Sequence, residues 1–186
     1  VLNFTQNRIK KRSKTSYLYT KMEKLKNKVR FLLLFLFLNN LATAQEIVPA
    51  NWELKFSRDN WKENDTVTLY LIGNIPEHQS VYSTNFNCDL GPMPSKLVFT
   101  NAGTNYLVVD SAKSVGEKPE YDDIFECTMK KFKGKALIKQ VVKMNTKQAE
   151  IKGYLEYQTC TDAMCLQYRV YFETKGSKVL KVQNGR

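Results

Sequence analysis

The stretch AEIKGYLEYQTCTDAMCLQYRVYFET, residues 149–174, determines how this chain is interpreted. Two segments of alternating polarity, residues 149–157 and 167–174, flank a short connection that has a cysteine on each side. Alternation with a period of two is typical of β-strands that bury one face. The stretch therefore predicts a hairpin in which Cys160 and Cys165 lie on either side of the turn.

The same alternation recurs in earlier segments, and it predicts further strands over residues 66–72, 95–100, 105–110 and 135–142. Turn-forming sequences separate these segments, beginning at Gly73, Leu90, Asn101 and Lys133. No stretch after residue 45 has a sustained helical stripe of apolar residues. Short strands broken by turns every 8 to 12 residues or so predict an all-β fold, an immunoglobulin-like antiparallel β-sandwich.

The N-terminal part has the layout of a targeting segment. Residues 22–44 combine a basic start, an apolar run over residues 31–38 and the small-residue exit Ala42-Thr43-Ala44. This pattern predicts a signal peptide cleaved after Ala44. The apolar run is much shorter than the roughly 20 residues of a membrane-spanning helix, which favours cleavage over a retained anchor. Residues 1–21 precede the predicted start and are interpreted as an upstream extension.

One domain is expected over residues 46–175, followed by a short polar tail over residues 176–186. The whole chain carries a net charge of +11, but residues 1–44 hold ten Lys and Arg against one acid, so the remainder carries +2. The cluster KKFKGK at residues 130–135 is interpreted as a solvated turn. A nucleic-acid partner is therefore not expected.

All four cysteines, Cys88, Cys127, Cys160 and Cys165, lie in the predicted exported part, where disulfides form. A bond between Cys160 and Cys165 closes a very small loop, which contributes least to stability in the chain-entropy model. Exposed disulfides are also the more easily reduced ones. The spacing is equally compatible with a structural hairpin staple and with a redox pair.

Metal binding and hydrolysis are disfavoured. A closed zinc site needs four ligands, and the sole histidine, His78, lies far from the cysteines in a predicted turn. No cysteine has a histidine near it in sequence that would act as its base. We therefore expect neither a metal nor a cofactor.

Residues 121–166 resemble the amino-terminal periplasmic domain of the thiol:disulfide interchange protein DsbD family, and LGPMPSKLVF at residues 90–99 fits the upstream part of the same pattern. The most specific piece is a lead of Gly153, Tyr157, Cys160 and Asp162 into a second nearby cysteine. The resemblance implies an immunoglobulin-like domain in which Cys160 and Cys165 are the redox pair. It also implies a periplasmic component of a protein-disulfide reductase, which takes electrons from a membrane-embedded thiol reductase and passes them to periplasmic thioredoxin-like proteins.

The family shields its disulfide with a short cap loop that carries an aromatic side chain. The matching positions here are Asp122, Asp123, Ile124 and Phe125, with Phe125 as the expected shield and Ile124 as the alternative. An apolar lid would restrict a labile disulfide to partners that can displace it.

The chain departs from the family pattern in three ways. Leu166-Gln167-Tyr168 replaces the usual proline-rich turn after the second cysteine, and the chain ends at Arg186, where typical members continue into a membrane domain, so a free-standing module is expected. Cys88 and Cys127 lie outside the pattern. They are expected to form a structural disulfide across the sandwich, with a second redox pair near the cap as the alternative.

A different class of function is also compatible with the sequence. The chain would then be a secreted immunoglobulin-like binding or assembly module with a purely structural Cys160–Cys165 disulfide. Such a module would bind through exposed aromatic residues, such as Trp52, Trp61 or Tyr168, although aromatic residues are more often part of a core than of a contact surface.

Overall fold

The computed structural model describes residue 19 and residues 21–33 and 46–185, and the chain divides into two units, residues 1–46 and 47–186. In the first unit, residues 21–33 are helical, and all but residue 21 belong to the predicted signal peptide. The predicted cleavage point after Ala44 and most of the upstream extension lie outside the described residues. No helix in the described part of the chain has the length and apolarity needed to cross a bilayer.

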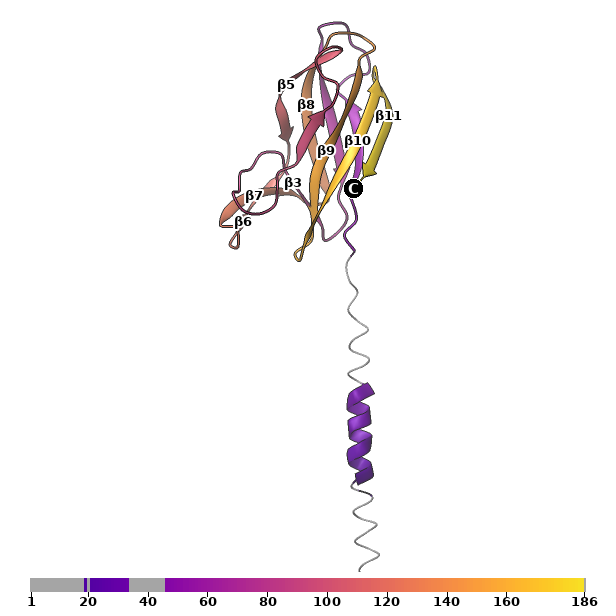
Figure 1. The fold of residues 1–186 in the computed structure, drawn as a ribbon, viewed down its shortest axis with the longest axis vertical. Helices are drawn as coiled ribbons and strands as arrows, with labels where there is room; N and C mark the ends of the chain where they lie inside the picture. Colours follow the sequence, from indigo (N-terminus) through magenta and orange to yellow (C-terminus); the bar gives the residue numbers. More distant parts are fainter. Residues whose placement is uncertain (1–18, 20, 34–45, 186) are drawn as a thin grey trace, which may run out of the picture. The chain divides into compact units, whose positions relative to one another are not determined.

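The second unit consists of two antiparallel β-sheets (Figure 1). The first sheet has the order β1-β2-β8-β5, formed by β1 (Asn51–Phe56), β2 (Thr66–Asn74), β8 (Lys135–Met144) and β5 (Tyr106–Ser114). The second has the order β11-β10-β9-β3-β7-β6, formed by β11 (Lys178–Gly185), β10 (Cys165–Lys175), β9 (Glu150–Cys160), β3 (Ser80–Tyr82), β7 (Cys127–Phe132) and β6 (Lys118–Asp122). Strand β4 (Lys96–Phe99) also pairs with β9.

This strand order is that of an immunoglobulin-like sandwich. The first sheet corresponds to the A, B, E and D strands of that fold, and β10, β9 and β4 correspond to G, F and C. The hairpin of β6 and β7, inserted between the D and E strands, and the edge strand β11 are additions to this framework. The predicted fold class is confirmed.

The core forms where the alternating faces of the two sheets meet. Burial alternates residue by residue along β2, β8 and β9, as expected for strands with one face turned to a core. Both sheets contribute large, almost fully buried side chains, among them Leu69, Ile138, Leu155, Tyr157 and Phe172. Core packing of side chains from both β9 and β10 therefore holds this long hairpin in place.

The predicted polar tail is wrong. Residues 178–185 form β11, which pairs with β10 from Arg169 opposite Gly185 to Lys175 opposite Lys178. Val179 and Val182 pack against the core, so backbone pairing and apolar burial both hold this segment in the sheet. The domain therefore extends to Gly185 rather than ending at residue 175.

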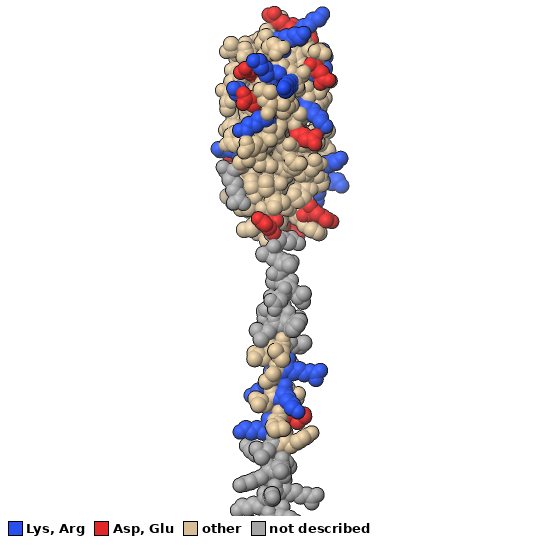
Figure 2. Space-filling view, turned by 90° about the vertical axis from the view of Figure 1, so that its right-hand side faces the viewer, with Lys and Arg blue, Asp and Glu red and all other residues tan. Residues whose placement is uncertain are grey.

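The lysine cluster at residues 130–135 is only partly a turn. Lys130 and Lys131 belong to β7, and the Nζ of Lys131 lies 2.7 Å from a carboxylate oxygen of Glu120 on β6. Figure 2 shows Lys and Arg interspersed with Asp and Glu at one end of the domain. On this face the lysines do not form a continuous basic surface.

Candidate functional site

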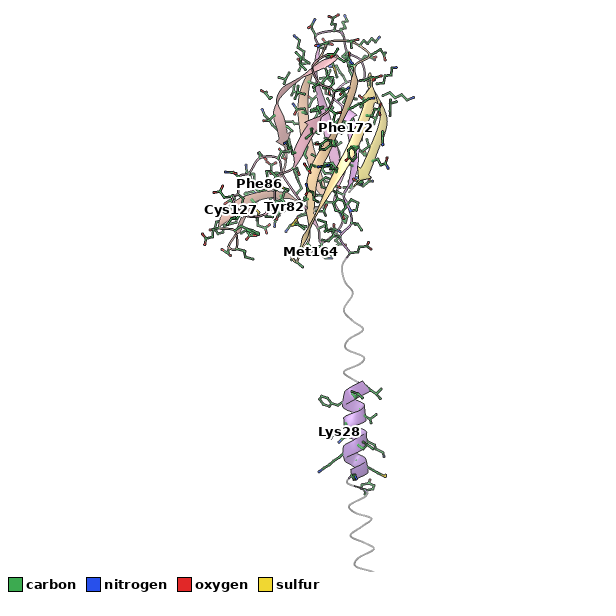
Figure 3. The ribbon with its side chains drawn as sticks, viewed as in Figure 1. Lys28, Tyr82, Phe86, Cys127, Met164 and Phe172 are labelled. Atoms are coloured by element: carbon green, nitrogen blue, oxygen red, sulfur yellow. A yellow bond between two sulfur atoms is a disulfide. The ribbon has the colours of Figure 1, made fainter. Side chains whose placement is uncertain are left out.

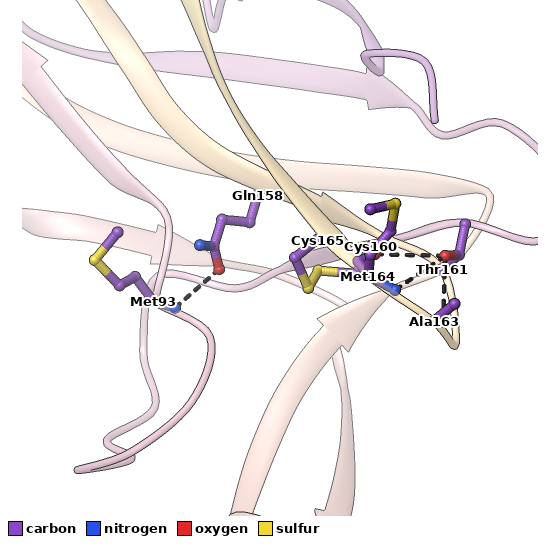
Figure 4. The surroundings of a disulfide bond; sticks show 7 residues. All are labelled: Met93, Gln158, Cys160, Thr161, Ala163, Met164 and Cys165. Carbon is purple, nitrogen blue, oxygen red and sulfur yellow. Dashed lines mark hydrogen bonds between the residues drawn. A yellow bond between two sulfur atoms is a disulfide. The ribbon is translucent and has the colours of Figure 1, made fainter. Parts of the chain in front are cut away.

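The two cysteines lie next to the turn of the β9–β10 hairpin, as predicted. Cys160 is paired directly opposite Cys165 and bonded to it, with a Cα–Cα distance of 4.1 Å. In the turn, the N–H of Thr161 donates to the carbonyl of Met164 at 2.9 Å (Figure 4). The ladder and this hydrogen bond align the two sulfurs, so the backbone itself keeps the cysteines adjacent.

The two sulfur-bearing residues differ sharply in exposure. Cys160 is only 3% exposed, whereas Cys165 is exposed and follows Met164, which is 56% exposed at the turn. Access to the sulfur decides which end of a disulfide an incoming thiolate attacks. Of the two cysteines, Cys165 is therefore the one that a thiolate from solvent would reach more readily.

Cys160 is buried in a small cluster separate from the main core. Its buried neighbours in that cluster are Tyr82 and Met129, and Phe86, Cys88 and Cys127 pack against it. Alternation along β9 points Thr159 into the sandwich and Cys160 to the opposite face of the sheet. Figure 3 shows Tyr82, Phe86 and Cys127 gathered beside β7, with Met164 at the hairpin turn.

Two of the packing residues, Phe86 and Cys88, come from the loop between β3 and β4, residues 83–95. At one end of the loop, the N–H of Ser83 donates to the carbonyl of Lys130 at 2.8 Å. At the other, the N–H of Met93 donates to Oε1 of Gln158 at 3.0 Å (Figure 4). Gln158 is two residues before Cys160, so the loop is attached to the strand that carries the buried cysteine.

Cys88 and Cys127 form a second disulfide with a Cα–Cα distance of 5.8 Å. The sequence predicted that this disulfide would bridge the two sheets of the sandwich, and that prediction of its place is wrong. Instead it joins the β3–β4 loop to Cys127, the first residue of β7. Because β7 pairs with β3 in the same sheet, Cys127 lies close to the loop that follows β3.

The predicted cap residues lie at the end of β6, where Asp122 is its last residue, and in the turn that leads to β7. Oδ1 of Asp122 accepts hydrogen bonds from the N–H groups of Ile124 (2.9 Å) and Phe125 (3.1 Å). Ile124 is 85% exposed, whereas Phe125 is 37% exposed and lies against Gly91. Of the two candidate shields, Phe125 has the packed position, and its contact is with the β3–β4 loop.

Charges of both signs lie near the cluster, because Asp122 and Glu120 act on Tyr82 while Lys131 is its strand partner on β7. Burial raises the pKa of the Tyr82 hydroxyl, and the carboxylates of Asp122 and Glu120 raise it further. Tyr82 therefore remains neutral at physiological pH and contributes an apolar ring to the burial of Cys160.

Two other residues of the family-like motif, Gly153 and Tyr157, have structural roles. Gly153 lies where β4 meets β9, and an added Cβ would collide with the carbonyl oxygen of Val98 and the ring of Phe172. The hydroxyl of Tyr157 donates to the carbonyl of Ala50 (3.4 Å) and to Oδ1 of Asn184 (3.2 Å). These residues position β9, which ends at Cys160, one half of the hairpin disulfide.

The structure also describes the surroundings of the histidine and of the aromatic residues named in the sequence analysis. In the described residues, no three His, Cys, Asp or Glu side chains gather into a group that could hold a metal ion, and His78 is exposed in a turn with a φ of 60°. The aromatic residues suggested for a binding module, Trp52, Trp61 and Tyr168, are 3–4% exposed. All three pack in the core, so they do not supply the contact surface that such a module would need.

Sequence reasoning missed Tyr82, Phe86 and Met129. They come from a three-residue strand, a loop and β7, and no spacing in the sequence relates them to Cys160. Only the pairing of β3 with both β7 and β9 brings them together.

No protein-family model and no curated protein matches this sequence. Among solved structures, the chain is similar to the N-terminal domain of DsbD from Neisseria meningitidis in the reduced form. The identity is 15% and the TM-score is 0.49, with 76% of this chain and 100% of that chain covered.

Proposed function

We propose that this chain is an exported thiol:disulfide exchange module that relays two electrons through Cys160 and Cys165. The observation that carries the proposal is the asymmetry of the pair, in which an accessible Cys165 is paired with a buried Cys160 on a hydrogen-bonded hairpin. A structural staple has no need of an exposed sulfur. A relay does, because its partners must reach one sulfur by direct attack.

The reaction has two balanced halves. In the first, a thiolate of a donor dithiol attacks Sγ of Cys165, the Cys160–Cys165 bond breaks, and Cys160 leaves as a thiolate and takes up a proton. The donor's second thiolate then attacks the donor sulfur of this mixed disulfide, which releases the donor as a disulfide and leaves Cys160 and Cys165 as thiols.

In the second half, the Cys165 thiolate attacks the disulfide of an acceptor and forms a new mixed disulfide. The Cys160 thiolate then attacks Sγ of Cys165, which restores the bond between them and releases the acceptor as a dithiol. Two electrons and two protons pass from donor to acceptor, and the domain returns to its starting state.

The partners are proposed from the sequence resemblance. The donor is a membrane-embedded thiol reductase and the acceptors are thioredoxin-like proteins of the periplasm, which the chain reaches through the predicted signal peptide of residues 22–44. In this scheme the turn of residues 122–125 and the β3–β4 loop act together as the cap, since Phe125 of the first packs on Gly91 of the second. A partner must fit around this cap to reach Cys165.

The reduction potential of the Cys160–Cys165 pair in the purified chain tests the proposal. We expect a value well above about −300 mV, because structural disulfides of secreted proteins lie below that level. A lower value would identify the pair as a structural staple and remove the basis for a relay.

A trapping experiment tests the assignment of roles within the pair. The Cys160→Ala variant should accumulate a mixed disulfide with an oxidised thioredoxin, because Cys165 attacks and no thiol resolves the product. The matched Cys165→Ala variant should accumulate far less, since its remaining thiol is buried. Equal yields from the two variants would contradict the assignment.

A further inference from the structure

We propose that the Cys88–Cys127 disulfide is a positioning group for this exchange: it holds the β3–β4 loop over Cys160, so that incoming thiolates attack Cys165 and not Cys160. The inference rests on the proposed function, because it concerns which sulfur of the same pair reacts. It assigns a role to two cysteines that lie outside the family-like pattern.

The second disulfide lies beside the first rather than at a distance. Cys88 and Cys127 pack against the cluster that buries Cys160. The ring of Phe86, two residues before Cys88, lies 5.6 Å from the ring of Tyr82 in the same cluster. A movement of Cys88 would therefore shift the side chains that cover Cys160.

The bond also attaches the middle of the loop. Hydrogen bonds hold the loop near its ends, at Ser83 and Met93, and Cys88 lies about midway between them. The disulfide joins this midpoint to a paired residue of β7, across a sequence separation of 39. Breaking the bond would leave the segment over Cys160 fixed mainly at its two ends.

A packing contact reinforces the same attachment from the other side. Gly91 has a φ of 122°, and a Cβ at this position would lie 2.9 Å from Cγ of Phe125. Phe125 is two residues before Cys127, and the intervening Glu126 has a φ of 51°, a conformation that residues other than glycine rarely adopt. The loop and the β6–β7 turn thus fit closely together around the disulfide.

The consequence for the chemistry is regioselectivity. A disulfide offers two sulfurs, and attack on either one releases the other as a thiolate. Attack on Cys165 leaves the mixed disulfide at the surface, where the partner can depart, with Cys160 beside it as the resolving thiol. The tethered loop blocks the opposite reaction, in which the partner would be bonded to the buried Cys160.

The test is to treat the oxidised full chain with glutathione and to locate the glutathione adducts by peptide mass spectrometry. In the wild type we expect adducts of this pair on Cys165. In the Cys88→Ser/Cys127→Ser variant we expect adducts on Cys160 as well, with attack on that sulfur raised about tenfold, because its cover is released.

Two further variants keep the test decisive if the double variant folds poorly. Gly91→Ala keeps both disulfides but displaces Phe125 from the loop, and attack on Cys160 should rise by a smaller factor, about threefold. Leu71→Ala weakens the main core away from the cluster, so it controls for lost stability and should leave the adducts on Cys165.

The outcomes separate the two proposals. An unchanged adduct pattern in both the double variant and Gly91→Ala would overturn the positioning role alone. A shift of the adducts in Leu71→Ala as large as in the double variant would also overturn the positioning role, because lost stability alone would then explain the result. A wild-type pair that exchanges with neither glutathione nor a reduced thioredoxin would instead overturn the proposed function.

Discussion

At the scale of single residues, the proposed exchange site depends on positions that carry no reactive group. Gly153 is the clearest case, because the carbonyl of Val98 and the ring of Phe172 occupy the space that any side chain would need. This close approach lets β4 pair with β9 and completes the sheet from which the cysteines project.

Gly153→Ala should lower the free energy of unfolding by about 2–3 kcal/mol, because the added methyl group meets backbone that cannot move freely. Urea unfolding would measure the change. Gly185→Ala is the matched control, since its new Cβ would meet mainly the flexible ring edge of Tyr171, and we expect a clearly smaller loss. Equal effects of the two substitutions would contradict this account of Gly153.

The sequence motif identified Gly153, Tyr157 and both hairpin cysteines, but not the reasons for the first two. Those reasons are contacts with Val98, Ala50 and Asn184, which lie 27 to 107 residues away along the chain. Such contacts follow from strand pairing, which a single sequence does not specify.

At the scale of elements, the longest predicted strands are those in which burial alternates. Strands β2, β8, β9 and β10 alternate between buried and exposed residues, so their period of two is visible in the sequence. In contrast, all three residues of β3 are buried and nearly all of β6 is exposed. Neither strand has an alternation to detect, and β11 also lacks one.

Strand β11 provides a prediction at this scale. Removing residues 178–186 should lower the free energy of unfolding by at least about 2 kcal/mol, because the buried parts of Val179 and Val182 are lost along with the pairing to β10. Thermal or urea unfolding would measure this loss. Lys181→Ala, at an exposed position of the same strand, should have little effect. A truncated chain as stable as the wild type would show that β11 contributes nothing to the fold.

At the scale of the whole molecule, Tyr157 links parts of the chain that are far apart in sequence. Its ring packs against Trp52 of the first sheet and Tyr168 of the second, with centroid distances of 5.2 and 5.9 Å. Burial raises the pKa of its hydroxyl to about 12. The protonation of one side chain is thereby coupled to the packing of both sheets.

This coupling predicts an alkaline limit to stability. The folded-state pKa lies above the unfolded value of 10.0, so the folded state retains a proton that the unfolded state releases, and stability falls as the pH rises from about 10 to 12. The loss should reach about 2 kcal/mol from this residue. Unfolding free energies measured from pH 8 to 12 should decline less steeply in Tyr157→Phe. An equal decline would show that other groups cause it.

The hairpin register also determines how the relay would turn over. Backbone pairing holds Cys160 opposite Cys165 in addition to the sulfur–sulfur bond, so we expect the two thiols to remain neighbours after reduction. Cys160 then acts at a high effective concentration on any partner bonded to Cys165. Mixed disulfides in the native chain should therefore be short-lived, and the domain can cycle between its oxidised and reduced states with little reorganisation of its backbone.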